Sequence, residues 1–154
     1  MPVVPNKISK SDEKSIHSDT GNKMFEEAKY YYKATQILEK EHDKKELFPP
    51  VLMNATFSCE LFSKSILFKS QSEKIIKGHS LKGLYDNFDE DIKVKMRQLY
   101  KKGMESRFEK CIDEIGDLFE FWRYRYEYKS YSTHYSFVLE YMEILYKIAQ
   151  SIYS

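Results

Sequence analysis

The chain has 154 residues with a formal net charge of +1, and 42% of its residues are hydrophobic. This length and apolar content suit one domain with its own core, while the small net charge excludes a global field that attracts nucleic acid or membrane. The low content of Gly (five) and Pro (four) favours helices over a turn-rich sheet protein.

The first 21 residues mix lysines with acids and show no hydrophobic periodicity. We expect residues 1–21 to form a flexible N-terminal tail without a secretory signal, and residues 22–154 to form one helical domain. A helical pattern begins near Met24, where an apolar stripe recurs at three- and four-residue steps. Its members are Phe25, Ala28, Tyr32, Thr35 and Leu38.

The segment after Pro49 and Pro50 predicts the central helix of a bundle. The two prolines stop whatever precedes them and can begin a helix. Apolar residues then line two sides, which is typical of a helix enclosed by neighbours. One side carries Leu52, Ala55, Cys59, Phe62 and Ile66, and the other carries Phe57, Leu61 and Phe68. Glu60 and Lys64 form an i,i+4 pair in the favourable order.

Two shorter patterns follow this helix. Gly78 marks a loop, and Ser80 is suited to cap a short helix after it. That helix carries Leu81, Leu84 and Tyr85. The next segment starts acidic and ends basic, as a helix dipole prefers, and Gly103 can end it. Its predicted buried stripe consists of Ile92, Met96 and Leu99.

Two longer patterns complete the chain. A helix from about residue 105 to residue 122 is predicted to bury Phe108, Cys111, Ile115, Leu118 and Trp122. The last helix begins near Ser132 or Thr133 as its cap. It is predicted to bury Tyr135, Val138, Met142, Leu145, Ala149 and Ile152. Such stripes, joined by short loops, predict an all-α, up-and-down bundle of four to five helices. No run of about 18 apolar residues is present, so we expect no membrane span.

Two cysteines, Cys59 and Cys111, fall in buried stripes and do not make a disulfide framework. We interpret them as small core residues and place the protein in a reducing cytoplasm. The sequence holds no CxxC, HExxH or His/Cys cluster and no Gly-rich phosphate loop. We therefore expect neither a bound metal nor a cofactor.

The stretch 119–134, FEFWRYRYEYKSYSTH, alternates basic and aromatic residues before the last helix. Single-stranded RNA is held by basic groups on its phosphates and by aromatic faces under its bases. Both kinds of group are present here, so the stretch predicts contact with RNA or a nucleotide. The residues expected to make it are Arg123, Arg125, Tyr126 and Lys129.

Two stretches together resemble the HEPN superfamily. The first is NATFSCELFSKSILFKS followed by KGHSLKGLYDNF, and the second is FEFWRYRYE just before the last helix. The resemblance covers residues 24–153. It implies a four- or five-helix bundle that often pairs as a homodimer. It also implies a role in RNA or nucleotide handling, in bacterial toxin–antitoxin pairs, stress responses or antiphage defence.

The nuclease branch of this superfamily carries an Arg followed, after four to six residues, by a His near the start of the last helix. The resemblance implies that two protomers bring these residues together and cleave RNA without a metal. Arg suits the phosphate and His suits the proton transfers. Here eight residues separate Arg125 from His134 and ten separate Arg123 from His134. The strict motif is therefore absent, and a stretched catalytic site of these three residues stays an alternative.

A structural interpretation of the same stretch also stays open. Its tyrosines can cover one end of the bundle, while Arg123 or Arg125 pairs with Glu60. We expect Glu60 and Lys64 to act as structural polar residues, and His79 to brace the loop before the short helix. The predicted function is a HEPN-like module, more a binder than an enzyme, for RNA, a nucleotide or a cognate partner protein. The alternatives are a metal-independent endoribonuclease and a purely structural adaptor.

Overall fold

The computed structural model describes residues 10–41, 43–71, 76–101, 103–116 and 135–154. These residues form six α-helices and one short 3-10 helix, η1 (Lys45–Leu47), and contain no strand. The predicted all-α bundle is confirmed. The six helices correspond to the six helical segments predicted from the sequence, and the short helix at residues 81–86 is the one beyond the predicted bundle of four to five.

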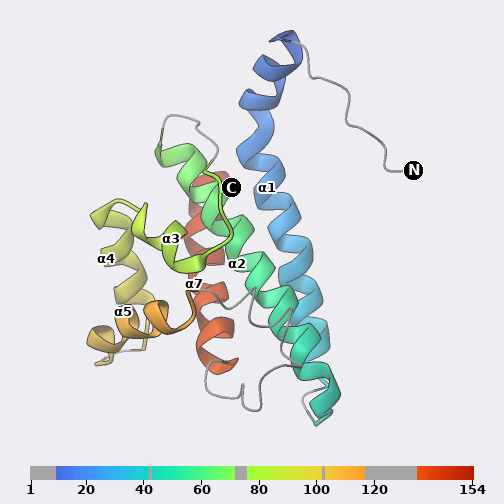
Figure 1. Cartoon of the computed structure of the whole chain (residues 1–154), viewed down its shortest axis with the longest axis vertical. Coiled ribbons are helices and arrows are strands. Elements are labelled where there is room, and N and C mark those ends of the chain that lie inside the picture. Colours follow the sequence, from blue (N-terminus) through green and yellow to red (C-terminus); the bar gives the residue numbers. More distant parts are fainter. Residues whose placement is uncertain (1–9, 42, 72–75, 102, 117–134) are drawn as a thin grey trace.

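Helices α1 (Lys10–Glu39) and α2 (Phe48–Ser70) form a long hairpin, seen as the blue and green ribbons of Figure 1. Pro49 and Pro50 occupy the first turn of α2, as predicted. Helix α1 begins at Lys10 and not near Met24, so residues 10–21 are helical where the sequence predicts a tail. Its contacts there involve Gly21, which has no side chain and packs against Tyr153 and Phe68. Hydrophobic periodicity does not register such a contact.

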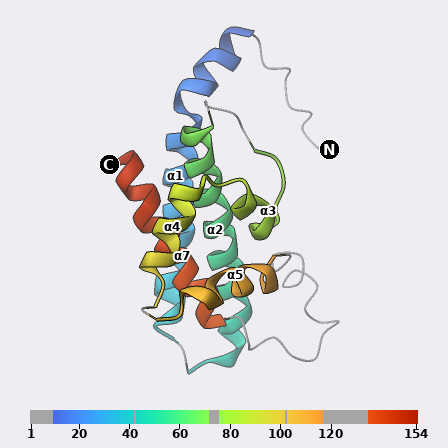
Figure 2. The same ribbon diagram turned by 90° about the vertical axis from the view of Figure 1, so that its left-hand side faces the viewer.

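Helix α2 is the centre of the molecule, as its two apolar sides predict. It packs against α1, against the short helix α3 (Leu81–Asp86) and against α7 (Tyr135–Tyr153). Figures 1 and 2 show α1, α2 and α7 side by side, with α3 beside α2. The members of the predicted α2 stripe are all fully buried: Leu52, Ala55, Cys59, Phe62 and Ile66.

Helices α3, α4 (Glu90–Leu99) and α5 (Glu105–Glu114) lie together on one side of α2 and α7 (Figure 1). Phe108 of α5 anchors this group, with its ring 5.3–5.9 Å from four other aromatic rings. Those rings belong to Tyr85, Tyr100, Phe137 and Tyr141. Aromatic pairs at this spacing add to the energy of burial and join α3, α5 and α7 into one core.

Several predicted boundaries and stripes differ from the structure. Helix α5 ends at Glu114, before the predicted end at residue 122, and Leu118 and Trp122 lie outside the described residues, as do the predicted caps Ser132 and Thr133. Leu99 and Ile152 were predicted to be buried but are 43% and 37% exposed. Each is the last residue of its predicted apolar stripe, and within the described residues no other helix covers it. In the part of the chain that is described, no helix has both the length and the apolar content needed to cross a bilayer.

Candidate functional site

Glu60 is a buried carboxylate at the centre of α2, and the side chains of Lys64 and His79 both contact one of its oxygens. Lys64 Nζ lies 2.9 Å from Glu60 Oε1, and His79 Nδ1 lies 2.7 Å from the same atom. The Glu60 side chain is 3% exposed, whereas that of His79 is 74% exposed. The imidazole therefore caps a charge that lies below the surface.

This arrangement reduces the cost of burying a charge on a central helix. An isolated ionised carboxylate is costly in an apolar core unless a partner and hydrogen bonds compensate it. Lys64 supplies the compensating charge from one turn along α2, and His79 supplies a second hydrogen-bonding group from the loop before α3. The structure thus brings together the three residues predicted to be structural and polar.

The second oxygen of Glu60, Oε2, is buried without a hydrogen-bond partner. The hydroxyls of Thr56 and Ser63 share this condition and lie on the same side of α2, at i−4 and i+3 from Glu60. The buried Tyr141 hydroxyl on α7 also lacks a partner in hydrogen-bonding geometry. Burial raises the pKa of Tyr141 well above its usual value, so its phenol stays protonated. The helical spacing of Thr56 and Ser63 from Glu60 is visible in the sequence, whereas the position of the Tyr141 hydroxyl depends on the packing of α7.

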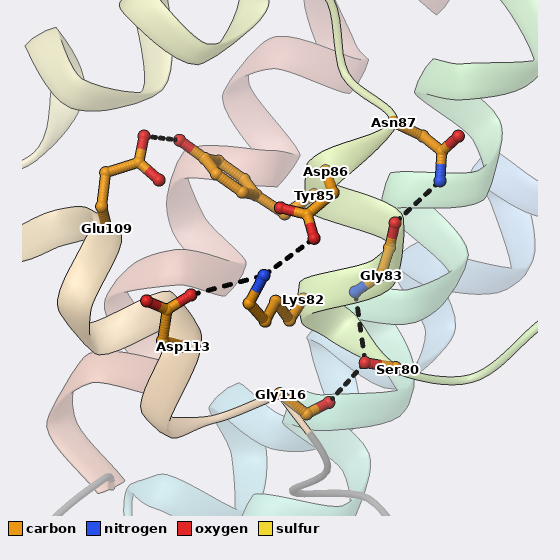
Figure 3. Close-up of polar contacts among 9 residues, drawn as sticks. All are labelled: Ser80, Lys82, Gly83, Tyr85, Asp86, Asn87, Glu109, Asp113 and Gly116. Atoms are coloured by element: carbon orange, nitrogen blue, oxygen red, sulfur yellow. Dashed lines mark hydrogen bonds and ion pairs between the residues drawn. The ribbon is translucent and has the colours of Figure 1, made fainter.

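The loop that carries His79 is fixed by contacts between α3 and α5, shown in Figure 3. Ser80 caps α3 by accepting a hydrogen bond from the Gly83 amide at 3.2 Å, as predicted. Lys82 bridges the two helices, 2.8 Å from Asp86 and 3.6 Å from Asp113. These contacts hold the start of α3, and therefore the residue before Ser80, in place.

A second set of bonds joins this loop to the end of α5. The Gly116 carbonyl accepts hydrogen bonds from the Leu81 amide at 3.1 Å and from the Ser80 hydroxyl at 3.0 Å. Tyr85 donates a hydrogen bond to Glu109 of α5 at 2.5 Å, which closes the same seam (Figure 3). Gly116 immediately precedes the stretch 117–134. The structure thus places Gly116, the last described residue before that stretch, next to the loop that carries His79.

The residues predicted to contact RNA or to cleave it lie outside the described residues. They are Arg123, Arg125, Tyr126, Lys129 and His134. The predicted pairing of Arg123 or Arg125 with Glu60 therefore stays a prediction. What the structure adds is that Glu60 Oε1 already has two partners, Lys64 and His79.

Neither cysteine is placed for nucleophilic chemistry. Burial raises the pKa of the Cys59 thiol, which is fully buried and points to the Val138 carbonyl at 3.9 Å. Burial also raises the pKa of Cys111, which is partly exposed on α5. Both thiols are therefore protonated near neutral pH. Within the described ranges, no three His, Cys, Asp or Glu side chains gather closely enough to hold a metal ion.

No protein-family model, curated protein or solved structure matches the chain.

Proposed function

We propose that the chain is a HEPN-like module that binds RNA through residues 119–134 and does not cleave it. It works as a homodimer in a bacterial defence, toxin–antitoxin or stress system. The observation that carries the proposal is the charge balance at Glu60. Because Lys64 already supplies one positive charge to this carboxylate, Arg123 and Arg125 are not required to neutralise it. Their charges are then available to an external anion.

The chemistry of the stretch fits single-stranded RNA better than a small anion. Arg123 and Arg125 offer planar guanidinium groups that bind phosphate through paired hydrogen bonds. Tyr126 and the neighbouring tyrosines offer faces on which bases stack, and Lys129 adds a further phosphate contact. A nucleotide would use only part of this row of alternating groups.

Cleavage is the competing function, and the spacing of the arginines from His134 argues against it. The test is incubation of the purified protein with total RNA and with a tRNA pool in EDTA, beside a His134→Ala variant. We expect intact RNA from both proteins, with circular dichroism showing that both are folded. Cleavage by the parent and not by the variant would establish the nuclease alternative and overturn the proposal.

The structural-adaptor alternative makes a different prediction for the arginines. If Arg123 and Arg125 serve only to complete the bundle, then changing both to Gln lowers the melting temperature and leaves any RNA binding of the folded protein unchanged. The proposal expects the reverse, with RNA affinity reduced and the melting temperature retained. Thermal melts and RNA titrations of the same preparations separate the two.

A further inference from the structure

A groove runs between α4 and α7. It has a volume of about 360 Å³, which is enough for a few side chains. Its lining comprises Lys95, Gln98 and Leu99 of α4 and Lys147, Ile148 and Ser151 of α7. The groove therefore has an apolar floor with one lysine on each helix.

The apolar part of the groove is uncovered in the described chain. Leu99 is 43% exposed at a position where the α4 stripe predicts burial. Ile148 is 6% exposed, and Ile152, one turn further along α7, is 37% exposed. Leu99 is thus the exposed apolar residue of the groove lining, and an exposed apolar side chain in a groove is typical of a surface that a partner covers.

Neither lysine forms an ion pair with the acidic residue one turn before it on the same helix. Lys147 lies four residues after Glu143, in the order that favours an ion pair on a helix. The Glu143 carboxylate instead accepts the Tyr32 hydroxyl of α1, at 2.9 and 2.8 Å to its two oxygens. Lys147 therefore has no ion-pair partner among the described residues, although Glu143 is one turn away.

Lys95 shows the same pattern on α4. Asp91 lies one turn before it, yet no ion pair joins the two within the described ranges. The lysine next in line, Lys101, is paired with Glu140 of α7 at 3.8 Å, so it does not add a free charge to the groove. No acidic residue lines the groove. Lys95 and Lys147 are therefore the charged residues that line the groove, beside its apolar floor.

We propose that the groove between α4 and α7 docks an acidic amphipathic helix of a partner protein. Apolar residues of the incoming helix lie on Leu99 and Ile148, and its carboxylates pair with Lys95 and Lys147. This is the helix-in-groove mode of recognition, with charge complementarity that selects the partner. An RNA strand would use the lysines but would leave the apolar floor uncovered, so the groove favours a peptide.

The test is a selection from a displayed library of amphipathic helices in which the positions flanking the apolar stripe vary freely. We expect the full chain to enrich helices with Asp or Glu at those positions. For enriched peptides, Leu99→Asp weakens binding by roughly tenfold or more, because it places a charge in the apolar contact. The double variant Lys95→Glu/Lys147→Glu reverses the preference and enriches Lys or Arg instead.

A matched control is Ile37→Asp, because Ile37 is an exposed apolar residue of α1 (56% exposed) away from the groove. It must leave peptide affinity unchanged, and thermal melts must show all variants folded. Enrichment without an acidic preference, or affinity that Leu99→Asp does not change, would overturn the proposal. Displacement of the peptide by single-stranded RNA with the same dependence on both lysines, and no dependence on Leu99, would make the groove a polyanion site and also overturn it.

Discussion

Glu60 shows how this protein places a charge inside an apolar helix. Its carboxylate is almost fully buried, and one carboxylate oxygen lies within hydrogen-bonding distance of both Lys64 Nζ and His79 Nδ1. A buried pair of this kind contributes little net stability, yet removing one partner is costly because the remaining charge is left uncompensated. Replacing one member of the Glu60–Lys64 pair is therefore expected to cost more stability than replacing both members.

We predict that Lys64→Met lowers the free energy of unfolding by about 2 kcal/mol, since Glu60 then keeps only His79. The double variant Glu60→Gln/Lys64→Met recovers part of this loss, because neither charge remains. Urea titrations of both variants measure the difference. Lys33→Met, at an exposed position of α1, is the control and changes stability by no more than about 0.5 kcal/mol. An equal loss in the single and double variants would contradict this account of Glu60.

Tyr153 is one of the buried tyrosines whose titration lowers stability at high pH. Its hydroxyl donates a hydrogen bond to the Ser65 carbonyl at 2.5 Å, and burial raises its pKa from 10.0 to about 12. Below pH 10 the phenol is protonated in both folded and unfolded chains, so its contribution to stability is fully present. Between pH 10 and pH 12 only the unfolded chain ionises, and the contribution is lost as the pH rises through the folded pKa.

We therefore predict that the urea midpoint of the parent falls more steeply between pH 10 and pH 12 than that of Tyr153→Phe. Comparing the two proteins cancels the titration of lysines, which both share. The absorbance of phenolate, followed in the same titrations, shows when ionisation occurs. Parallel pH profiles for parent and variant would refute the assigned role of Tyr153.

At the scale of elements, α1 approaches α2 and α7 most closely at Gly21. A Cβ placed on Gly21 would lie 2.7 Å from Phe68 Cδ1, which is closer than packed atoms allow, and would also meet the Tyr153 hydroxyl. Gly83 in α3 is the opposite case, because its added Cβ would meet only the Ser80 side chain, at 3.5 Å from Cβ and 3.6 Å from Oγ, which are ordinary contacts. Two glycines in two helices therefore respond differently to the same change.

We predict that Gly21→Ala destabilises the protein by about 1 to 2 kcal/mol through overpacking, despite the better helix propensity of alanine. Gly83→Ala stabilises it by up to about 1 kcal/mol, because it restricts the unfolded chain without a clash. Thermal melts of the two variants, beside the parent, show whether each substitution raises or lowers stability. A stabilising Gly21→Ala would show that α1 does not pack at this point.

Local sequence patterns predict where the helices of this fold form better than they predict which helix packs over a given face. The two-sided apolar pattern of α2 and the Ser80 cap are local features, and the structure confirms both. Leu99 belongs to a regular stripe, but periodicity shows only which face a residue lies on and not whether a neighbour covers it. The exposure of Leu99, at the end of the α4 stripe, is therefore seen only in the structure.

The candidate site divides in the same way. The Glu60–Lys64 pair follows from i,i+4 spacing on one helix, so the sequence predicts it. The contact of His79 with Glu60 joins residues 19 apart through a loop, and it depends on the packing of α3 against both α2 and α5. The unpartnered Tyr141 hydroxyl, likewise, lies near α2 only because α7 packs there.

In the molecule as a whole, the α1–α2 hairpin and α7 pack together as a frame, and α3, α4 and α5 pack against this frame (Figures 1 and 2). The last described residue before the stretch 117–134, Gly116, is held on this frame by Ser80 and Leu81. The proposed RNA-binding residues thus follow a fixed point.

The measurement that tests the central claim most directly is a fluorescence anisotropy titration of labelled single-stranded RNA at several salt concentrations. It compares the parent with Arg123→Gln/Arg125→Gln, and gel analysis confirms that the RNA stays intact. We predict binding by the parent that weakens with salt. The double variant binds more weakly, with a salt dependence reduced by about 0.7 per lost phosphate contact. Equal affinity and equal salt dependence for the two folded proteins would contradict the claim that this stretch binds RNA.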